Sequence, residues 1–239
     1  MKKLQYLVIG LIIITVTYPL GSEYLERVKE KISEKNLESG VILYDLEGYQ
    51  FDVPLKYYYL IYQKTNRWPT PKKERQSVKS FEIDVVLPNM LPFSEQTAEK
   101  FEARGWKDKM WITLWSHDNV IGDFGAWFNK NKHKYRILGF SNEAPSLIHI
   151  IDHRGGIIEN DENYSEKYFK SVNDFNEYFY IQCEHESTKV FPTYPSCKLH
   201  TKYGELKLTL TFARKHMSDW EEILNNAVKL LDRFKVSIN

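Results

Sequence analysis

Apolar and polar residues alternate most regularly in the last third of the chain. Every second position from Leu206 to Phe212 is apolar, while Lys207, Thr209 and Thr211 stand between them. A period of two residues is typical of a β-strand that buries one face and leaves the other polar. The pattern therefore predicts a strand with a single buried face.

The segment after this strand has the spacing of a helix instead. Its apolar positions are Trp220, Ile223, Leu224, Ala227, Leu230, Leu231 and Phe234. They repeat with the period of an amphipathic helix, and Ser218 and Glu221 have the spacing of a capping box. We expect a C-terminal helix that covers the buried face of the preceding strand.

Shorter patterns of the same kind predict the other elements. Helices are expected at Glu23–Lys35, capped by Ser22, and at Glu95–Arg104, capped by Ser94 and closed by Gly105. Strands are expected at Val41–Tyr44, Phe81–Leu87, Met110–Trp115, Tyr135–Phe140, Tyr178–Cys183 and Cys197–Thr201, and the isoleucines beside His149 favour a further strand. Loops are expected at Trp68–Lys73 and Arg154–Asn163, and a short helix or loop at Gly122–Asn131. Without a sustained strand–helix–strand alternation, the fold class is α+β, with antiparallel sheets and flanking helices.

The N-terminus has the pattern of an export signal. Two lysines precede an apolar run from Leu4 to Leu20. The small residues of an A-x-A cleavage site are missing, which favours an uncleaved signal anchor over a cleaved signal peptide. We expect residues 1–21 to be this segment, and residues 22–239 to be a domain in the periplasm, tethered to the inner membrane, or soluble there after cleavage. The domain could divide into two lobes near residues 116–135.

The two cysteines, Cys183 and Cys197, fall in neighbouring predicted strands. In an oxidising compartment they predict a disulfide, which would contribute about 3 kcal/mol for a loop of about 15 residues. Metal binding would need further thiols at ligand spacing, and a reactive thiol would need a CxxC motif or a base nearby.

Charge argues against one class of partner. The chain has 33 Lys and Arg against 32 Asp and Glu, and it lacks the positive excess of a general nucleic-acid-binding protein. Aromatic residues make up 15% of the sequence, a composition that suits β-rich cores and protein interfaces equally.

Four short patterns resemble catalytic motifs incompletely. His149 and His153 have zinc-ligand spacing on a helix but lack the glutamate base. Gly139–Asn142 begins like a nucleophile elbow, but Glu143 replaces its second glycine. The others are Ser116-His117-Asp118, a triad adjacent in sequence, and Asp123-Phe124-Gly125, a kinase tripeptide without its partner motifs. We expect no catalytic residue, metal ligand or cofactor, while a hydrolase whose pocket gathers His117, His149 or His153 remains an alternative.

Several segments together resemble one family. They are Phe51–Tyr59, Trp68-Pro69, Val86–Phe93, Ile181–Cys183, Pro195–Cys197, Leu208–Phe212 and Trp220–Ile223. Together they are similar to the periplasmic immunity proteins that protect bacteria from lipase effectors of the type VI secretion system. The resemblance implies a non-enzymatic protein that binds and inhibits a phospholipase toxin. The chain departs from the lipoprotein members of the family because it has no cysteine for a lipid anchor.

An inhibitor of this kind needs a few aromatic or arginine anchors on its surface. The candidates are Tyr57, Tyr58, Tyr62, Arg67 and Trp68 in one region, and Phe191 and Tyr194 between two prolines in another. Core packing is the alternative role of these aromatics. The alternative function is an envelope assembly or scaffold protein that binds no toxin.

Overall fold

The computed structural model describes residues 37, 39–116, 130, 133, 135–152, 165–170, 178–184 and 195–237. Residues 41–239 form one compact unit, and residues 1–40 form a unit of their own. The expected signal segment, the helix Glu23–Lys35 and most of the suggested lobe boundary at 116–135 lie outside the described residues. None of the described helices is long and apolar enough to cross a membrane.

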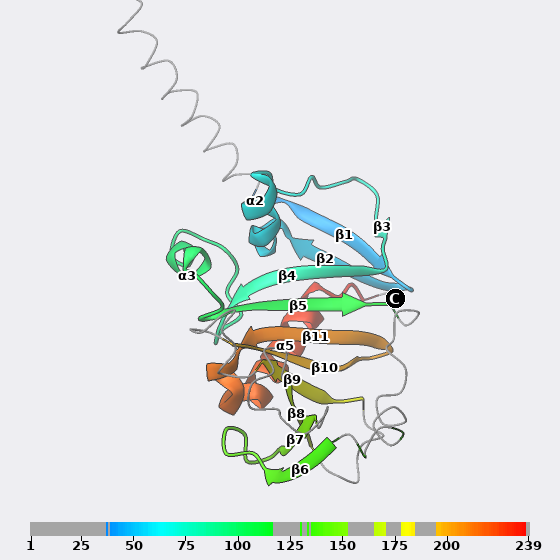
Figure 1. Ribbon diagram of the computed structural model, residues 1–239. Coiled ribbons are helices and arrows are strands. Elements are labelled where there is room, and N and C mark those ends of the chain that lie inside the picture. The colour runs from blue at the N-terminus through cyan, green and yellow to red at the C-terminus, as the bar shows by residue number, and fades with distance from the viewer. Residues whose placement is uncertain are drawn as a thin grey trace, which may run out of the picture. The chain divides into compact units, whose positions relative to one another are not determined.

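An eight-stranded antiparallel sheet is the centre of the second unit (Figure 1). The strands occur in the order β4 (Ser80–Val86), β5 (Lys109–Trp115), β11 (Leu206–Ala213), β10 (Ser196–Tyr203), β9 (Tyr180–Glu184), β8 (Ser165–Phe169), β7 (Ile148–Asp152) and β6 (Tyr135–Phe140). The α+β class and the antiparallel sheet predicted from the sequence are confirmed. Strand β8 was not predicted, and neither were β2 (Tyr49–Pro54) and β3 (Gln76–Ser77) of a second, smaller sheet.

A smaller three-stranded sheet has the order β2 (Tyr49–Pro54), β1 (Val41–Leu46) and β3 (Gln76–Ser77). Strands β1 and β2 are antiparallel, whereas β3 runs parallel to β1. The small sheet packs on the large one through aromatic rings, since Phe81 of β4 stacks on Tyr44 at 4.9 Å between ring centroids and meets Phe51 edge-on at 5.2 Å. The two sheets therefore share one core.

The C-terminal helix α5 (Trp220–Phe234) lies behind the large sheet (Figure 1). Six of the seven apolar positions that the periodicity predicts are buried, and Leu224 is only half-buried. The buried positions are Trp220, Ile223, Ala227, Leu230, Leu231 and Phe234. The predicted capping box is wrong. Ser218 belongs to the 3-10 segment η4 (Arg214–Asp219), and its hydroxyl donates to Asp219. Helix α5 starts at Trp220 without a side-chain cap.

Strand β11 is buried along its whole length. The prediction of one buried face is wrong, because β11 is central in the sheet and its polar residues Thr209 and Thr211 are 9% and 5% exposed. The remaining described helices are short: η1 (Leu55–Tyr57), α2 (Tyr59–Thr65) and α3 (Ala98–Glu102). The helix expected at 95–104 is thus reduced to α3, and Ser94 does not cap it, since Thr97 is the residue before its first turn.

Candidate functional site

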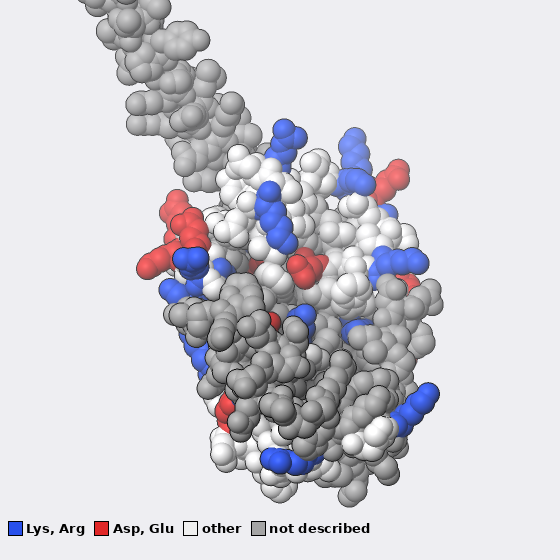
Figure 2. Space-filling view, viewed as in Figure 1, with Lys and Arg blue, Asp and Glu red and all other residues white. Residues whose placement is uncertain are grey.

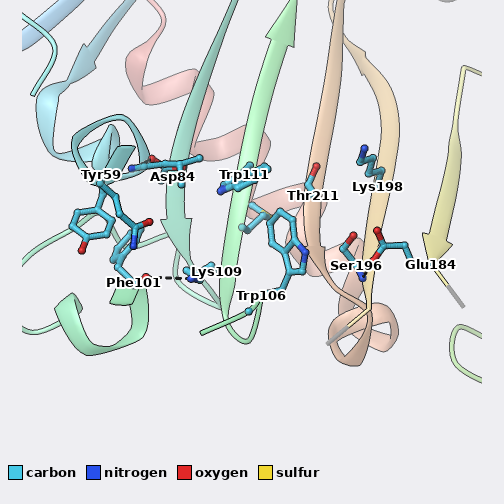
Figure 3. Close-up of a pocket in the computed structure, with 14 residues that line it drawn as sticks. Tyr59, Asp84, Phe101, Trp106, Lys109, Trp111, Glu184, Ser196, Lys198 and Thr211 are labelled. Atoms are coloured by element: carbon cyan, nitrogen blue, oxygen red, sulfur yellow. Dashed lines mark hydrogen bonds between the residues drawn. The ribbon is translucent and has the colours of Figure 1, made fainter. Parts of the chain in front are cut away.

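A row of polar and aromatic side chains crosses the large sheet on the face opposite its apolar core. Asp84 of β4 pairs with Trp111 of β5, Trp111 with Thr211 of β11, and Thr211 with Lys198 of β10. Directly opposed residues of antiparallel strands project from the same face. The register alone therefore places these four side chains side by side, as Figure 3 shows.

This row forms the floor of a cavity of about 470 Å³. Tyr59 from the start of α2 and Phe101 from α3 contribute to one wall, and Trp106 stands against Trp111 with 4.4 Å between ring centroids. Glu184 and Ser196 line the cavity at the opposite end (Figure 3). The cavity thus combines aromatic walls with charged groups from four separate strands.

Asp84 is the most deeply buried charged residue of this lining, with 4% of its surface exposed. Its Oδ2 accepts a 2.7 Å hydrogen bond from the backbone N–H of Leu60 and so caps the first turn of α2. Among the described residues, no hydrogen-bond donor lies within reach of its Oδ1. Burial raises the pKa of Asp84 to about 7, against the opposing effects of the Leu60 hydrogen bond and of Lys64 and Lys109.

Lys109 lies two residues before Trp111 on β5 and is held inside the cavity. Its Nζ donates hydrogen bonds to the carbonyl oxygens of Phe101, at 3.2 Å, and Ala103, at 2.7 Å. Burial lowers the pKa of Lys109, while Asp84 opposes the shift. At the far end, Glu184 accepts from the backbone N–H of Ser196 at 2.9 Å. Fixed polar groups within aromatic walls suit the cavity to accept a side chain of a partner protein, with Asp84 as an acceptor.

Two of the predicted anchors lie beside this cavity. Tyr62 and Trp68 stack at 4.8 Å, and both pack against Tyr59, which lines the cavity. They are only partly buried, and Arg67 is exposed. The aromatic surface of Tyr62 and Trp68 is therefore continuous with the cavity wall.

The other predicted anchors have different positions. Tyr57 and Tyr58 are 7% and 1% exposed, and Tyr57 packs edge-on against Phe234 of α5 at 4.9 Å. For these two tyrosines the alternative role, core packing, is the one that the structure shows. Phe191 and Tyr194 lie outside the described residues.

The predicted disulfide between Cys183 and Cys197 is present and joins β9 to β10. The two cysteines are register partners in the sheet, with 4.0 Å between their Cα atoms. The disulfide therefore fixes the end of the cavity that contains Glu184 and Ser196, the residues adjacent to the two cysteines.

A buried ionic network lies close to the disulfide, and the sequence did not reveal it. Arg214, at the end of β11, binds Glu143 through two hydrogen bonds of 3.0 and 2.6 Å and Glu166 through one of 2.6 Å. Tyr168 donates to Glu166, and His149 lies 3.1 Å from the same carboxylate. Burial acts to raise the pKa of Glu166, but the neighbouring His149, Arg214 and Tyr168 side chains lower it to about 2.

This network explains two of the incomplete catalytic patterns. Glu143, which replaces the glycine of a nucleophile elbow, is a partner of Arg214, and the Ser141 hydroxyl oxygen accepts from the backbone N–H groups of Glu143 and Ala144. His149 of β7 stacks on Tyr168 of β8, its register partner, with 4.7 Å between ring centroids. Both residues therefore stabilise the fold. Most of the triad-like and kinase-like patterns, together with His153, lie outside the described residues.

Charge and metal-ligand patterns add little to the site. On the face shown in Figure 2, positive and negative side chains of the described residues are interspersed, and acidic side chains gather mainly near α3. Within the described ranges, no group of three or more His, Cys, Asp or Glu side chains is arranged to hold a metal ion.

Comparisons with known proteins identify the fold. No protein-family model and no curated protein matches the sequence significantly. The fold is similar to that of the Neisseria meningitidis iron-regulated outer membrane lipoprotein FrpD, with a TM-score of 0.55 and 14% identity over 82% of this chain and 93% of FrpD. It is also similar to Smlt3025, an immunity protein of the Stenotrophomonas maltophilia type IV secretion system, with a TM-score of 0.53 and 11% identity over 82% of this chain and 94% of Smlt3025. The chain thus shares its fold with a secretion-system immunity protein and with an envelope lipoprotein.

Proposed function

We propose that this protein is an immunity protein that binds a toxin delivered by a bacterial secretion system and inhibits it by occlusion. The similarity to Smlt3025 carries the proposal, because it extends over 82% of this chain and 94% of Smlt3025. A protein inhibitor requires a rigid scaffold and a surface that buries about 800 Å² on each partner, and it requires no catalytic group of its own.

The proposed toxin is a lipase effector of a type VI secretion system that acts in the periplasm. The sequence resemblance supports this narrower identification. Several of the segments that carry it, such as the cysteine pair, β11 and the start of α5, are framework positions in the structure. These segments therefore support the predicted fold more strongly than they support a lipase as the toxin.

The proposed binding surface comprises the cavity and the stacked pair Tyr62 and Trp68. Large aromatic side chains that become desolvated at the centre of an interface dominate its affinity. Trp68 is half-buried against Tyr62 and Tyr59, so it is already held in one orientation before a partner arrives. A pre-organised aromatic loses little conformational entropy on binding.

The decisive experiment is co-expression of this protein with a type VI lipase effector of the same organism, exported to the periplasm. We expect protection of the cells, and a complex of the two purified proteins in which lipase activity falls. Trp68→Ala should weaken the complex by at least about 2 kcal/mol, roughly 30-fold. Leu91→Ala, at a residue that is 45% exposed, is the matched control and should bind like the wild type. Equal killing with and without the protein would refute the proposal.

The proposed location is the periplasm, with the apolar N-terminal segment as a tether. A reporter enzyme fused after Asn239 should then be active only outside the cytoplasm, and the protein should stay with membranes after a high-salt wash. Recovery of a soluble chain that begins near Ser22 would instead indicate cleavage of the segment.

An envelope scaffold or assembly protein is the second candidate. The similarity to FrpD, an outer membrane lipoprotein, favours it. Such a protein would bind an envelope component, and cells that make the lipase would die whether or not it is present. A third possibility, a hydrolase, would require the purified protein to turn over esters or lipids, and we expect no turnover.

A further inference from the structure

The edge strand β6 exposes an unusual amount of apolar surface. Five large hydrophobic side chains are exposed among the described residues, and three of them are on β6: Ile137 at 48%, Leu138 at 43% and Phe140 at 73%. Isolated exposed hydrophobic residues are common, but a contiguous group indicates an interaction site. The group lies on the last strand of the eight-stranded sheet (Figure 1).

The outer edge of β6 also leaves backbone groups open. Strand β6 pairs with β7 on its inner side, and in the part of the chain that the structure describes no hydrogen bond reaches residues 136–140 from the outer side. Edge strands with open N–H and C=O groups readily pair with an extended segment of another chain.

The opposite edge of the sheet is protected. Strand β4 exchanges two backbone hydrogen bonds between Val86 and Leu91, at 2.9 and 3.0 Å, and its Asp84 side chain caps α2. These contacts cover part of the outer side of β4. The two ends of the same sheet therefore differ, and only β6 combines an open edge with exposed apolar side chains among the described strands of this sheet.

A bulge in β6 indicates which kind of strand can pair with its outer edge. The register with β7 shifts between Ile137 and Gly139, and Gly139 has a φ of 102°, a left-handed conformation that favours glycine. Pairing with β6 of a second copy would bring two bulges into one ladder. A regular strand from a different protein would meet only one, so it fits this edge better.

We propose that the outer edge of β6 binds an extended segment of the toxin by strand addition, with Ile137, Leu138 and Phe140 contacting apolar side chains of that segment. This inference rests on the proposed function. The cavity extends from β4 to β9, and strands β8 and β7 separate it from β6. The segment at β6 is therefore a contact separate from the side chain bound in the cavity.

Hydrogen–deuterium exchange of the full chain, alone and with a purified type VI lipase effector of the same organism, tests the proposal. We expect those amides of residues 136–140 that face away from β7 to exchange at least 10-fold more slowly in the complex. Failure of the two wild-type proteins to bind would refute the proposed function. A complex that leaves these amides unprotected would refute the strand addition alone. Protection already present without the lipase would also overturn it, in favour of self-association if it rises with protein concentration.

Substitutions provide the second readout. Phe140→Lys and Leu138→Lys should each weaken the complex at least 10-fold, because they place a charge in the apolar contact. Leu91→Lys changes a residue of similar exposure, 45%, away from β6 and should weaken the complex less than 3-fold. Equal effects at all three positions would contradict a specific role of β6. Thermal unfolding of each variant separates loss of binding from loss of the fold.

Discussion

Replacing Arg214 by Met should destabilise the protein strongly, because the side chain is the shared partner of a buried network. Arg214 and Glu166 are each 6% exposed at the side chain. Without the guanidinium, the buried Glu166 carboxylate loses this cationic partner, while Tyr168 and His149 remain beside it. Breaking one side of a buried ion pair costs about 3–5 kcal/mol.

The pKa of Glu166 gives a second measure of the same interaction. Despite burial, its hydrogen bonds lower the pKa from 4.5 to about 2, a shift that corresponds to roughly 3 kcal/mol in favour of the ionised form. Because the folded-state pKa lies below the ordinary value, this stabilisation is present above pH 4.5 and is lost as the pH falls towards 2. Arg214 supplies part of it, so we expect Arg214→Met to cost about 3 kcal/mol at pH 7.

The assay is chemical denaturation of the full chain, followed by tryptophan fluorescence at several pH values. The adjacent Lys215→Met is the control, because the pair of Lys215 and Asp108 is 47% and 33% exposed and should contribute less than about 1 kcal/mol. The difference between wild type and Arg214→Met should narrow between pH 4.5 and 2. The reasoning is refuted if Arg214→Met lowers the free energy of unfolding by less than about 1 kcal/mol at pH 7. It is also refuted if the difference in free energy between wild type and variant does not depend on pH.

Three further predictions concern single features of the fold. Burial raises the pKa of Asp84 above its ordinary value to about 7, so its contribution to stability is present below about pH 4 and is lost as the pH rises through 7. The urea midpoint of the wild type should therefore be lower at pH 8 than at pH 5, and Asp84→Asn should remove this difference. A variant that keeps the same difference between the two pH values would contradict the prediction. Replacing both Cys183 and Cys197 by Ser should lower the free energy of unfolding by roughly 2–4 kcal/mol, whereas two titratable thiols in the unreduced wild type would exclude the disulfide. Tyr58→Ala should cost about 3 kcal/mol of stability, and Arg67→Ala less than about 0.5 kcal/mol; similar denaturation midpoints for the two variants would show that Tyr58 is not a core residue.

The sequence by itself determined the local elements with strong periodicity. The strand at Leu206–Phe212 and the helix from Trp220 to Phe234 are where the apolar positions place them, because side chains that face the apolar core recur every second residue in a strand and every three or four residues in a helix. The disulfide followed from two cysteines in neighbouring predicted strands of a chain whose N-terminus is predicted to be an export signal. Weakly patterned strands such as β8 were missed, since Ser165–Phe169 mixes charged and aromatic residues without a regular alternation.

Only the tertiary structure decided which distant residues meet. Arg214 and Glu143 are separated by 71 residues, and no local pattern links them. The cavity depends on the order of strands β4, β5, β11 and β10, which puts Asp84 in line with Trp111 and Lys198. The same strand order buries the polar face of β11 and leaves β6 at an open edge. The periodicity of a segment indicates which of its side chains face the core. A site depends on which segments become neighbours, and the packing of the whole chain decides this adjacency.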